Sequence, residues 1–508
     1  MKPLENTPPP DRASGILLHM TSLPGDYGIG DFGPGAVDFI DFLVAAGQRY
    51  WQILPLAPVD QVFGCSPYMS LAAFAGNPLL ISPDRLLEDG LLTKAEAHAH
   101  PPFSEYHVDF SAVTAYKHLL LKQAFTRLGN SALRDAFQAF CQTERAWLED
   151  YALFMSLRDH EGRKPWYQWA RPLVNRDASA LARIRALQAE TILYYQFEQF
   201  IFFRQWWQLR EYANRQGISL IGDLPIYVSH DSADVWANQA CFLLDGKTSA
   251  PTHVAGVPPD YFSKTGQRWG NPLYRWKIGH KKNTALYDWW RQRFRQMSQL
   301  VDSVRIDHFR AFESYWQVPA AEKTAINGKW IKGPGKQFFV EMADQIADLP
   351  IIAEDLGVIT PEVIALRDGL RFPGMKILQF AFDSDEKNLY LPHNFASTHC
   401  VVFTGTHDNN TTVGWYLEDA SKEGQARVRR YAHSEASEIH WDLIRLALSS
   451  IATTAIIPMQ DLLGFGGDCR MNMPGSVQGN WKWRCAARFM TPEVAVRLRN
   501  ETKFYGRR

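Results

Sequence analysis

Residues 303–310 read SVRIDHFR, an apolar, strand-like run that delivers an acid, Asp307, near its end. Two later stretches have the same form, residues 350–357 (PIIAEDLG) and residues 401–408 (VVFTGTHD). A parallel barrel collects its active-site residues at the C-terminal ends of its strands, so three such stretches predict an acid-lined site at one mouth. Two carboxylates in such a site can cleave a glycosidic bond, one as nucleophile and one as proton donor.

The rest of the chain is consistent with such a barrel. Strand-like runs bounded by turn residues occur at 15–23, 49–56, 219–228, 303–310, 350–356, 376–382, 400–408 and 453–460. Several are apolar nearly throughout, as expected of strands buried on both faces of a parallel sheet. Helical patterns lie between most of them, for example at 36–46, 286–300, 337–347 and 361–370. The sequence therefore predicts an α/β fold, a (β/α)8 TIM barrel.

Two connections are too long for ordinary barrel crossovers. Residues from about 60 to 215 contain long helical patterns, which predict a mainly helical subdomain inserted at the C-terminal face of the barrel. Residues from about 229 to 277 are rich in Trp, Tyr, Pro and Gly with weak periodicity, which predicts a loop-rich insertion typical of a lid. We expect residues 1–14 to form a flexible tail and residues 15–508 to form a single catalytic domain.

The composition is balanced in charge. Among 508 residues there are 54 Lys and Arg and 54 Asp and Glu. Proteins that bind nucleic acid or anionic membrane surfaces carry a basic excess, so neither is an expected partner. An uncharged substrate suits this composition better.

Cysteine usage and the apolar segments predict a cytoplasmic protein. The six cysteines are scattered, without a CxxC pair or metal-ligand spacing, so we expect free thiols. The N-terminal residues lack the apolar core of a signal peptide. The longest charge-free apolar stretch, residues 446–460, is too short and too rich in Ser and Thr to span a bilayer.

The alternation within SVRIDHFR places Arg305 and Asp307 on one face of the strand. A guanidinium on the same face favours the ionised carboxylate, which is the form that an attacking nucleophile needs. For this strand alone, a buried Arg–Asp pair that merely holds the barrel end together is the simpler alternative.

Glu354 in PIIAEDLG follows four apolar residues at a predicted strand end. Apolar surroundings raise the pKa of a carboxyl group, which suits a general acid. The alternative is that Glu354 or Asp355 caps the next helix. However, Thr360-Pro361-Glu362 already has the form of that helix's N-cap and first turn, so Glu354 is free for another role.

The third stretch ends in His407-Asp408. No second His or Cys lies at ligand spacing, so a pair of side chains that holds sugar hydroxyls is favoured over a metal site. Asp223, in the segment GDLP at the end of the third predicted strand, adds another polar strand end.

One pattern points to a different class of protein. Residues 28–33 satisfy GxGxxG after a plausible strand, as in a dinucleotide-binding turn. The next strand, residues 49–56, offers no acid for a ribose hydroxyl, so a dinucleotide-dependent oxidoreductase is disfavoured.

Eight longer segments, between about residues 15 and 484, form a specific series. They are GILLHMTSLPGDYGIGDFG, SPYMSLAAFAGNPLLI, IGDLPIYV, GVPPDYFSKTGQRWGNPLYRW, VRIDHFR, IIAEDLG, TGTHDNNTTVGWY and RMNMPGSVQGNWKWR. In this order they resemble the 4-α-glucanotransferases (amylomaltases, or disproportionating enzymes) of glycoside hydrolase family 77, within the α-amylase-like retaining superfamily.

The resemblance implies a role for each acid. Asp307 corresponds to the nucleophile, Glu354 to the general acid/base and Asp408 to the transition-state stabiliser. Arg305 and His407 correspond to the residues that position Asp307 and the hydroxyls of the bound sugar.

The resemblance also implies substrate contacts. Tyr68, Asp223 and Asn480 stand where the family has substrate-binding residues. Tyr261 and Trp269 lie in the stretch that matches the family's flexible loop over the acceptor side, and aromatic rings suit the apolar faces of sugars. The family is a (β/α)8 barrel with insertions and uses no metal or organic cofactor.

Two positions depart from the family pattern. Asn410 stands where members often have Asp, and Ala311 where they often have Gly. Both departures leave the three acids in place, so we expect them to affect the preferred glucan length or the pH optimum rather than the reaction.

The predicted reaction is a double displacement on α-1,4-glucans with maltooligosaccharides as donors and acceptors. It predicts that the carboxyls of Asp307 and Glu354 lie ~5–5.5 Å apart. The alternatives are an α-glucan hydrolase, which uses the same acids with water as acceptor, and a non-catalytic glucan-binding barrel.

Overall fold

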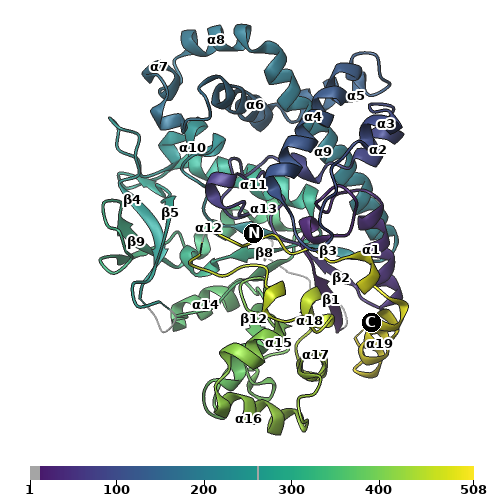
Figure 1. The fold of residues 1–508 in the computed structure, drawn as a ribbon. Coiled ribbons are helices and arrows are strands. Elements are labelled where there is room, and N and C mark those ends of the chain that lie inside the picture. Colours follow the sequence, from purple (N-terminus) through teal and green to yellow (C-terminus); the bar gives the residue numbers. More distant parts are fainter. Residues whose placement is uncertain (1–11, 260–262, 477, 508) are drawn as a thin grey trace.

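The computed structural model describes residues 12–259, 263–476 and 478–507 of the chain. Eight parallel strands form one sheet in the order β11-β8-β3-β2-β1-β14-β13-β12. The strands are β1 (Ala13–Leu17), β2 (Tyr50–Gln52), β3 (Ser219–Pro225), β8 (Ser303–Asp307), β11 (Ile351–Ala353), β12 (Gly374–Ile377), β13 (Cys400–Phe403) and β14 (Thr454–Pro458). The two end strands, β11 and β12, also meet, because the Ala353 N–H donates to the Pro373 carbonyl at 2.9 Å. The sheet is therefore a nearly closed barrel, and the predicted fold class is confirmed (Figure 1).

Each predicted run overlaps one barrel strand. Strands β1, β13 and β14 are buried along their whole length, which explains their continuous apolar sequences. The run predicted at 376–382 is mostly not a strand, because β12 ends at Ile377 and Leu378–Phe382 continues as a 3-10 helix. The tail predicted for residues 1–14 lies largely outside the described residues, and its last two residues belong to β1.

Helices cover the outside of the barrel between the strands (Figure 1). They include α1 (Pro34–Ala45), α11 (Thr284–Leu300), α12 (Lys336–Glu341), α13 (Ala343–Ile346), α14 (Pro361–Gly369), α16 (Lys422–Ala432), α17 (Ile439–Ser449), α18 (Met459–Leu462) and α19 (Pro492–Phe504). Helix α14 begins as predicted, with Thr360 at the N-cap and Pro361 in the first turn. Glu354 is therefore not part of that cap.

The long connection between β2 and β3 is mainly helical and lies at the top of the molecule in Figure 1. It contains α2 (Pro83–Glu88), α3 (Lys94–Ala97), α4 (Phe110–Leu128), α5 (Arg134–Thr143), α6 (Arg145–His160), α7 (Arg171–Val174), α8 (Ala178–Leu187) and α9 (Ala189–Arg215). Helix α9 also packs on the barrel. Its Trp206 indole lies 5.4 Å from the Phe32 ring and donates to the Leu300 carbonyl at 3.0 Å.

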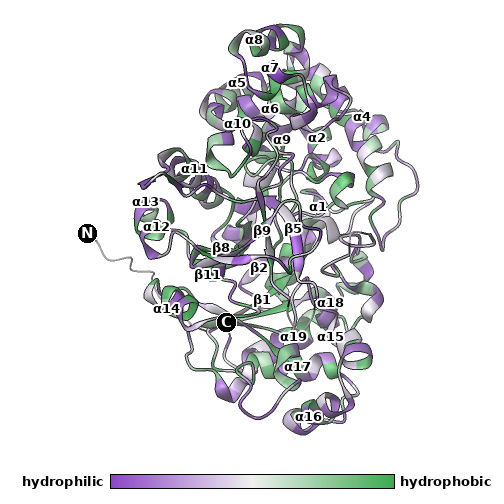
Figure 2. Cartoon of the chain, turned by 90° about the vertical axis from the view of Figure 1, so that its left-hand side faces the viewer, coloured by the Kyte–Doolittle hydropathy of each residue, from purple (hydrophilic) through white to green (hydrophobic). Residues whose placement is uncertain are grey.

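The segment predicted as loop-rich, residues 229–277, contains helix α10 (Ala233–Ala237) and two further strands, β4 (His253–Val257) and β5 (Gln267–Pro272). Strands β4 and β5 join β9 (Ser314–Pro319) and β10 (Lys329–Lys332) in an antiparallel sheet of order β10-β9-β4-β5. Strand β4 pairs with the nearby β5 and also with β9, some sixty residues later. The prediction missed these strands because β5 is mostly hydrophilic (Figure 2) and the pairing with β9 is not local. The small hairpin β6 (Lys277–Ile278) and β7 (Lys281–Lys282) follows.

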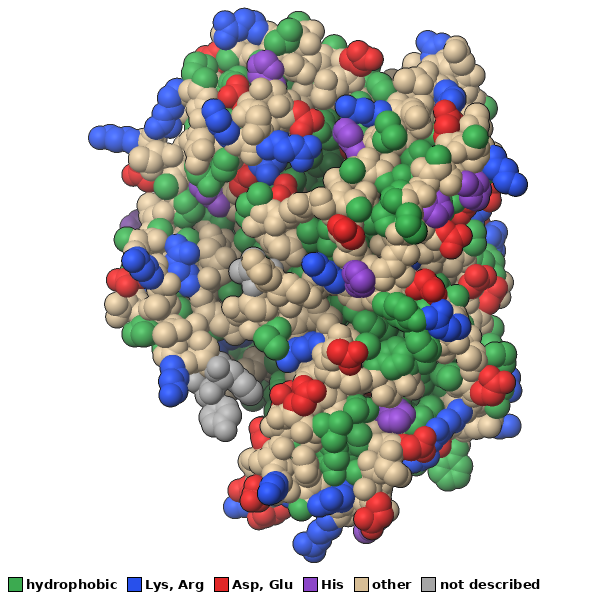
Figure 3. Space-filling view, viewed as in Figure 1, with side chains coloured by type: hydrophobic (Ala, Val, Ile, Leu, Met, Phe, Trp, Pro, Cys, Tyr) green, Lys and Arg blue, Asp and Glu red, His purple; other side chains and the backbone are tan. Residues whose placement is uncertain are grey.

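The surface carries both signs of charge. On the face shown in Figure 3, Lys and Arg side chains are interspersed with Asp and Glu. Among the helices that the structure describes, none combines the length and the apolar character needed to cross a membrane.

The buried guanidinium of Arg507 joins segments at the N-terminal end of the barrel. It donates to the Leu448 carbonyl at 2.7 Å, to the Ala452 carbonyl at 2.8 Å and to the Ala13 carbonyl at 3.1 Å. Leu448 lies in the last turn of α17, where helix carbonyls lack partners, and Ala13 begins β1. The side chain thus satisfies buried carbonyls that no intrahelical donor reaches.

We expect Arg507→Ala to lower the free energy of unfolding by roughly 3–5 kcal/mol, because several buried carbonyls lose a charged donor together. Lys503→Ala is the matched control, since Lys503 is exposed on α19, and it should cost less than about 0.5 kcal/mol. Urea unfolding followed by circular dichroism measures both. Equal midpoints for the two variants would contradict this role for Arg507.

Candidate active site

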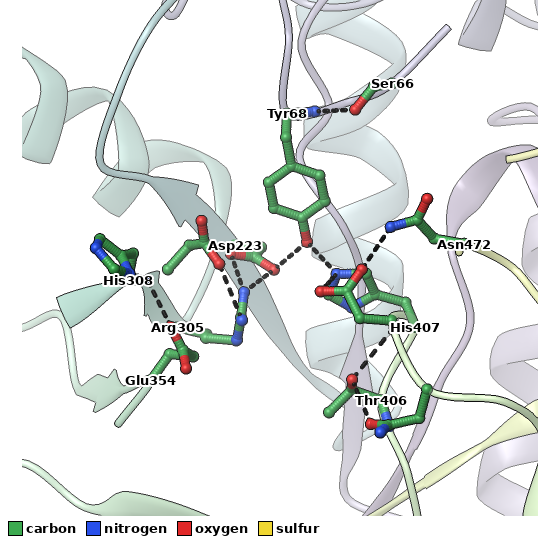
Figure 4. Close-up of polar contacts among 12 residues, drawn as sticks. Ser66, Tyr68, Asp223, Arg305, His308, Glu354, Thr406, His407 and Asn472 are labelled. Atoms are coloured by element: carbon green, nitrogen blue, oxygen red, sulfur yellow. Dashed lines mark hydrogen bonds and ion pairs between the residues drawn. The ribbon is translucent and has the colours of Figure 1, made fainter. Parts of the chain in front are cut away.

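The predicted acids meet at the C-terminal ends of adjacent strands. In the sheet register Ala353 of β11 pairs with Ile306 of β8, so the next residues, Glu354 and Asp307, lie side by side. Asp223 of β3 pairs with Arg305 on the other side of β8. The mouth of the barrel therefore brings together side chains from β3, β8, β11 and the loop after β13 (Figure 4).

Arg305 links two carboxylates. Its Nη1 lies 2.9 and 2.7 Å from the two carboxylate oxygens of Asp223, and its Nη2 lies 3.0 Å from Oδ1 of Asp307. Arg305 and Asp223 are buried, whereas the side chain of Asp307 keeps 29% of its surface exposed. Arg305 and Asp223 therefore form a buried ion pair, and Asp307 is held by the same guanidinium while it faces the open mouth.

Tyr68 and His407 form a second polar link. The Tyr68 hydroxyl donates to Oδ2 of Asp223 at 2.7 Å and lies 2.8 Å from Nε2 of His407. Because the hydroxyl has one proton, Nε2 of His407 must carry the proton that the Tyr68 oxygen accepts. The same Nε2 lies 3.4 Å from Oδ2 of Asp408. His407 thus stands between the buried Tyr68–Asp223 pair and the third acid.

Asp408 faces the mouth and is oriented by a distant loop. Its side chain is 43% exposed. The Asn472 amide donates to Oδ1 at 2.6 Å, and Arg470 donates to the Asp408 backbone carbonyl at 2.7 Å. Neither Asn472 nor Arg470 was identified from the sequence as part of the site, because a loop without periodicity gives no sign of where its amides point.

Glu354 is held by backbone donors. Its Oε2 accepts from the His308 N–H at 2.7 Å and its Oε1 from the Leu356 N–H at 2.8 Å. His308 has φ 52°, in the left-handed region that non-glycine residues seldom adopt. This turn directs the backbone after Asp307 towards Glu354. Sequence reasoning did not find His308, since its contribution is a backbone conformation.

The two acids differ in their electrostatic surroundings. Burial raises the pKa of Glu354 to about 7, against the lowering effect of Arg305. Burial also raises the pKa of Asp307, to about 6, and Arg305 is the largest influence that lowers it. Two interacting carboxyls titrate as a pair. Burial thus favours a proton on Glu354 near neutral pH, while the Arg305 guanidinium at 3.0 Å favours the ionised form of Asp307.

The remaining predicted substrate contacts are Trp269, Asn480 and Tyr261. Trp269 is half-buried, and its ring meets His308 edge to face at 4.8 Å. Asn480 is buried, and both ends of its amide bond the loop itself, at Met473 N–H (3.0 Å) and the Ser476 carbonyl (2.9 Å). Asn480 thus shapes the loop that carries Asn472. Tyr261 lies outside the described residues.

The two residues that depart from the family pattern, Ala311 and Asn410, are both buried. Ala311 is buried in the 3-10 helix Phe309–Phe312. The amide of Asn410 donates to Asp419 at 3.1 Å and to Glu418 at 3.3 Å. An aspartate at position 410 would place a third carboxylate against these two, so an amide suits this position electrostatically.

We therefore expect Asn410→Asp to destabilise the protein by about 1–3 kcal/mol at pH 7. The new carboxyl would have a raised folded-state pKa, so its cost should be present above that pKa and fade as the pH falls towards its unfolded value. Asn409→Asp is the matched control, because Asn409 only accepts, from the N–H and hydroxyl of Thr406 at 2.9 Å. Thermal unfolding of both variants at pH 7 and pH 5 measures the difference, and equal melting temperatures would contradict the prediction.

The segment with the GxGxxG pattern, residues 28–33, is packed closely against other parts of the protein. Asp31, within it, forms a buried ion pair with Lys117 at 2.8 Å. A Cβ added at Gly30 would lie 2.0 Å from the Met20 carbonyl oxygen. The glycines here allow close backbone packing. Across the described ranges, no group of three or more His, Cys, Asp or Glu side chains is arranged to hold a metal ion.

Comparisons with known proteins agree on one family. Residues 18–490 match the family model described as 4-alpha-glucanotransferase, glycoside hydrolase family 77. The 4-alpha-glucanotransferase of Synechocystis is 52% identical over 502 residues, covering 98% of each chain. That of Thermus thermophilus is 47% identical, covering 96% of this chain and 97% of the relative. The amylomaltase from Streptococcus agalactiae, solved in complex with acarbose, superposes with a TM-score of 0.93 at 39% identity and covers 98% of this chain and 99% of its own.

The fold and the acid-lined mouth define a barrel enzyme of the retaining glucan-active class. The chain belongs to the 4-alpha-glucanotransferase family, glycoside hydrolase family 77. The resemblance inferred from the sequence is confirmed, and the activity of the family is glucan transfer. The hydrolase alternative receives no better support from these matches.

Proposed function

We propose that Asp307, Glu354 and Asp408 carry out the transfer by a retaining double displacement on α-1,4-glucans. The observation that carries this proposal is that two acids at the ends of neighbouring strands, Asp307 and Glu354, lie in different electrostatic surroundings. Arg305 lies 3.0 Å from the Asp307 carboxylate, while Glu354 has a pKa raised to about 7 by burial. One acid is thus prepared to attack and the other to donate a proton.

The first half-reaction breaks the glycosidic bond. Glu354 gives its proton to the leaving oxygen, while a carboxylate oxygen of Asp307 attacks the anomeric carbon from the opposite side. A carbon–oxygen bond to Asp307 forms, the glycosidic bond breaks, and the shortened glucan leaves with a free 4-hydroxyl. Adjacent strands lie ~4.8 Å apart. The adjacent positions of Asp307 and Glu354 in the register therefore support the ~5–5.5 Å carboxyl separation expected of a retaining enzyme.

The second half-reaction reverses the first with a new partner. Glu354, now ionised, takes the proton of an acceptor's 4-hydroxyl, whose oxygen attacks the anomeric carbon and displaces Asp307. The α configuration returns, because two inversions restore the original one. The proton again resides on Glu354, so the enzyme is ready for another cycle.

We assign Asp408 to the hydroxyls of the distorted sugar ring. Its exposure, and its restraint by Asn472 at 2.6 Å, support a carboxylate aimed at the substrate. The Nε2–H of His407 faces the same region. Contacts that tighten as the ring flattens stabilise the oxocarbenium-like state more than the ground state.

Water must be a poorer acceptor than sugar for transfer to dominate. We propose that the Trp269 segment shields the mouth, since Trp269 packs against His308 directly after the nucleophile. The predicted role of Tyr261 in the same stretch remains part of this proposal. The Streptococcus agalactiae amylomaltase was solved with acarbose. We infer that the corresponding mouth of this chain binds maltooligosaccharides as donor and acceptor.

The product pattern from maltotriose tests this function. Transfer gives glucose together with longer oligomers, while the total number of reducing ends stays constant. Hydrolysis raises the number of reducing ends, and a binding protein produces neither change. A steady rise in reducing ends without longer oligomers would replace our proposal with the hydrolase alternative.

We also propose a cytoplasmic setting without nucleic-acid or membrane partners. The six cysteines are free thiols, as suits a reducing compartment. The equal numbers of acidic and basic residues agree with an uncharged glucan as the main partner.

A further inference from the structure

His407 lines a small cavity. It has a volume of about 20 Å³, and most of its other lining residues lie at or after the ends of β1, β13 and β14. His19, two residues beyond β1, lines it together with His407. A cavity needs roughly 10–15 Å³ to accept one water molecule, so this one is large enough.

Two buried imidazole nitrogens lack partners around this cavity. His407 uses Nε2 for Tyr68, at 2.8 Å, while its Nδ1 has no hydrogen-bond partner among the described residues. Nδ1 of His19 is likewise buried and unpartnered in the described chain, and only 6% of the His19 residue is exposed. A buried polar atom without a partner loses its hydration and gains no hydrogen bond in return, so native proteins rarely leave two of them beside one polar cavity.

We propose that an ordered water in this cavity joins Nδ1 of His19 to Nδ1 of His407, which makes His19 a positioning residue for the active-site histidine. This inference rests on the role proposed above for His407 and extends that role to a residue that does not touch the substrate.

The proton count specifies the direction of the hydrogen bond at His407, and we assign the opposite direction at His19. Tyr68 donates its single proton to Asp223, so Nε2 of His407 carries a proton and, in the neutral ring, Nδ1 carries a lone pair. The water then donates one O–H to Nδ1 of His407 and accepts the Nδ1–H of His19.

The electrostatic surroundings favour a water bridge between two neutral imidazole rings. Burial, and to a smaller extent the nearby imidazole of His407, lower the pKa of His19 to about 3. Burial is also the largest influence on His407 and lowers its pKa, while Asp408 raises it. Two neutral rings facing one cavity suit a water molecule, which can both donate and accept.

The bridge has a direct consequence for catalysis. It holds His407 in the Nε2–H tautomer, with that proton directed towards Tyr68 and Asp408. Without the water, Nδ1 of His407 is unpaired, and the ring keeps only its contacts at Nε2 to hold its orientation. The geometry of Asp408 at the transition state depends on the same ring.

Two substitutions at His19 test the bridge. His19→Phe keeps a flat ring of similar size and removes the nitrogen, and we expect kcat for maltotriose to fall about tenfold with little change in KM, because an unpaired Nδ1 is left behind. His19→Asn places a polar atom near the position of Nδ1 and should recover most of the loss. His118→Phe is the matched control, since that half-buried ring bonds Tyr194 in the helical insertion, at 3.2 Å, far along the chain from the site. It should leave kcat unchanged.

A high-resolution crystal structure of the unmodified protein gives the second readout. We expect a density peak within hydrogen-bonding distance of both Nδ1 atoms, absent in His19→Phe. A dry cavity, an unchanged kcat in His19→Phe, or equal losses in the Phe and Asn variants would overturn the bridge. His407→Ala distinguishes this failure from a broader one. If His407→Ala also kept full activity, the role proposed for His407 would fail. If His407→Ala lost activity while His19→Phe did not, only the bridging water would be rejected.

Discussion

We expect the replacement of Asp307 with asparagine to abolish glucan transfer while the barrel stays folded. The amide cannot form the glycosyl ester, so we expect kcat for maltotriose to fall by about 10⁴-fold or more. The fold should survive, because the asparagine oxygen can still accept from Arg305 and the side chain is partly exposed. Initial rates of glucose release measure the loss, and circular dichroism melting confirms that the protein remains folded.

The matched control is Asp302→Asn, the same change just before the start of β8. Asp302 pairs with Arg210 at 2.8 Å and accepts the Leu220 N–H at 2.8 Å, at the end of the barrel away from the mouth. This variant should lose stability and keep its kcat, the reverse of Asp307→Asn. If Asp307→Asn retained more than about 1% of the rate, another acid would have to be the nucleophile.

The parts of this site that a sequence reveals are those carried by short, regular patterns. Alternation along β8 placed Arg305 and Asp307 on one face, and the guanidinium does contact Asp307. The N-cap at Thr360 correctly indicated that Glu354 was not part of helix α14. Each inference used neighbours within about ten residues, which is the range over which backbone geometry constrains side chains.

The parts that were missed depend on contacts between distant segments. Asn472 reaches Asp408 from 64 residues away, and β9 pairs with β4 across the whole of helix α11 and strand β8. Asn480 bonds its own loop through both ends of its amide, contacts that the sequence did not predict, and its binding of substrate stays a prediction. His308 contributes through a left-handed backbone conformation that the surrounding sequence does not predict.

Glu354→Ala should reduce transfer from maltotriose about 10³-fold, since the leaving oxygen then departs without its proton. Alanine is the informative choice. Both oxygens of Glu354 accept backbone N–H groups, from His308 and Leu356, and the NH₂ of a glutamine would face one of these donors. If the rate on maltotriose is lost but the first, ester-forming step is kept on a donor with a good leaving group, the variant lacks its acid and the rest of the site is intact.

The pH dependence of the unmodified enzyme follows from the same two groups. Activity needs Asp307 ionised and Glu354 protonated. With the pKa of Asp307 raised to about 6 and that of Glu354 to about 7, kcat/KM should fall on both sides of a narrow optimum. The acidic limb reports protonation of Asp307, and the alkaline limb reports loss of the proton from Glu354. In Glu354→Ala the alkaline limb should disappear, and a limb that persisted would belong to another group.

α-Maltotriosyl fluoride with azide completes the test of Glu354. Fluoride leaves without protonation, so Asp307 can still form its bond to the anomeric carbon in Glu354→Ala while the carbon–fluorine bond breaks. The second step then stalls, because no base activates an acceptor hydroxyl, and mass spectrometry should show the glycosyl ester on Asp307. Azide needs no base and can enter the space that the side chain vacated, so it should release the ester as an α-glycosyl azide and restore turnover. A β-glycosyl azide would mean that azide had displaced fluoride directly, without an ester on Asp307, and would contradict the double displacement.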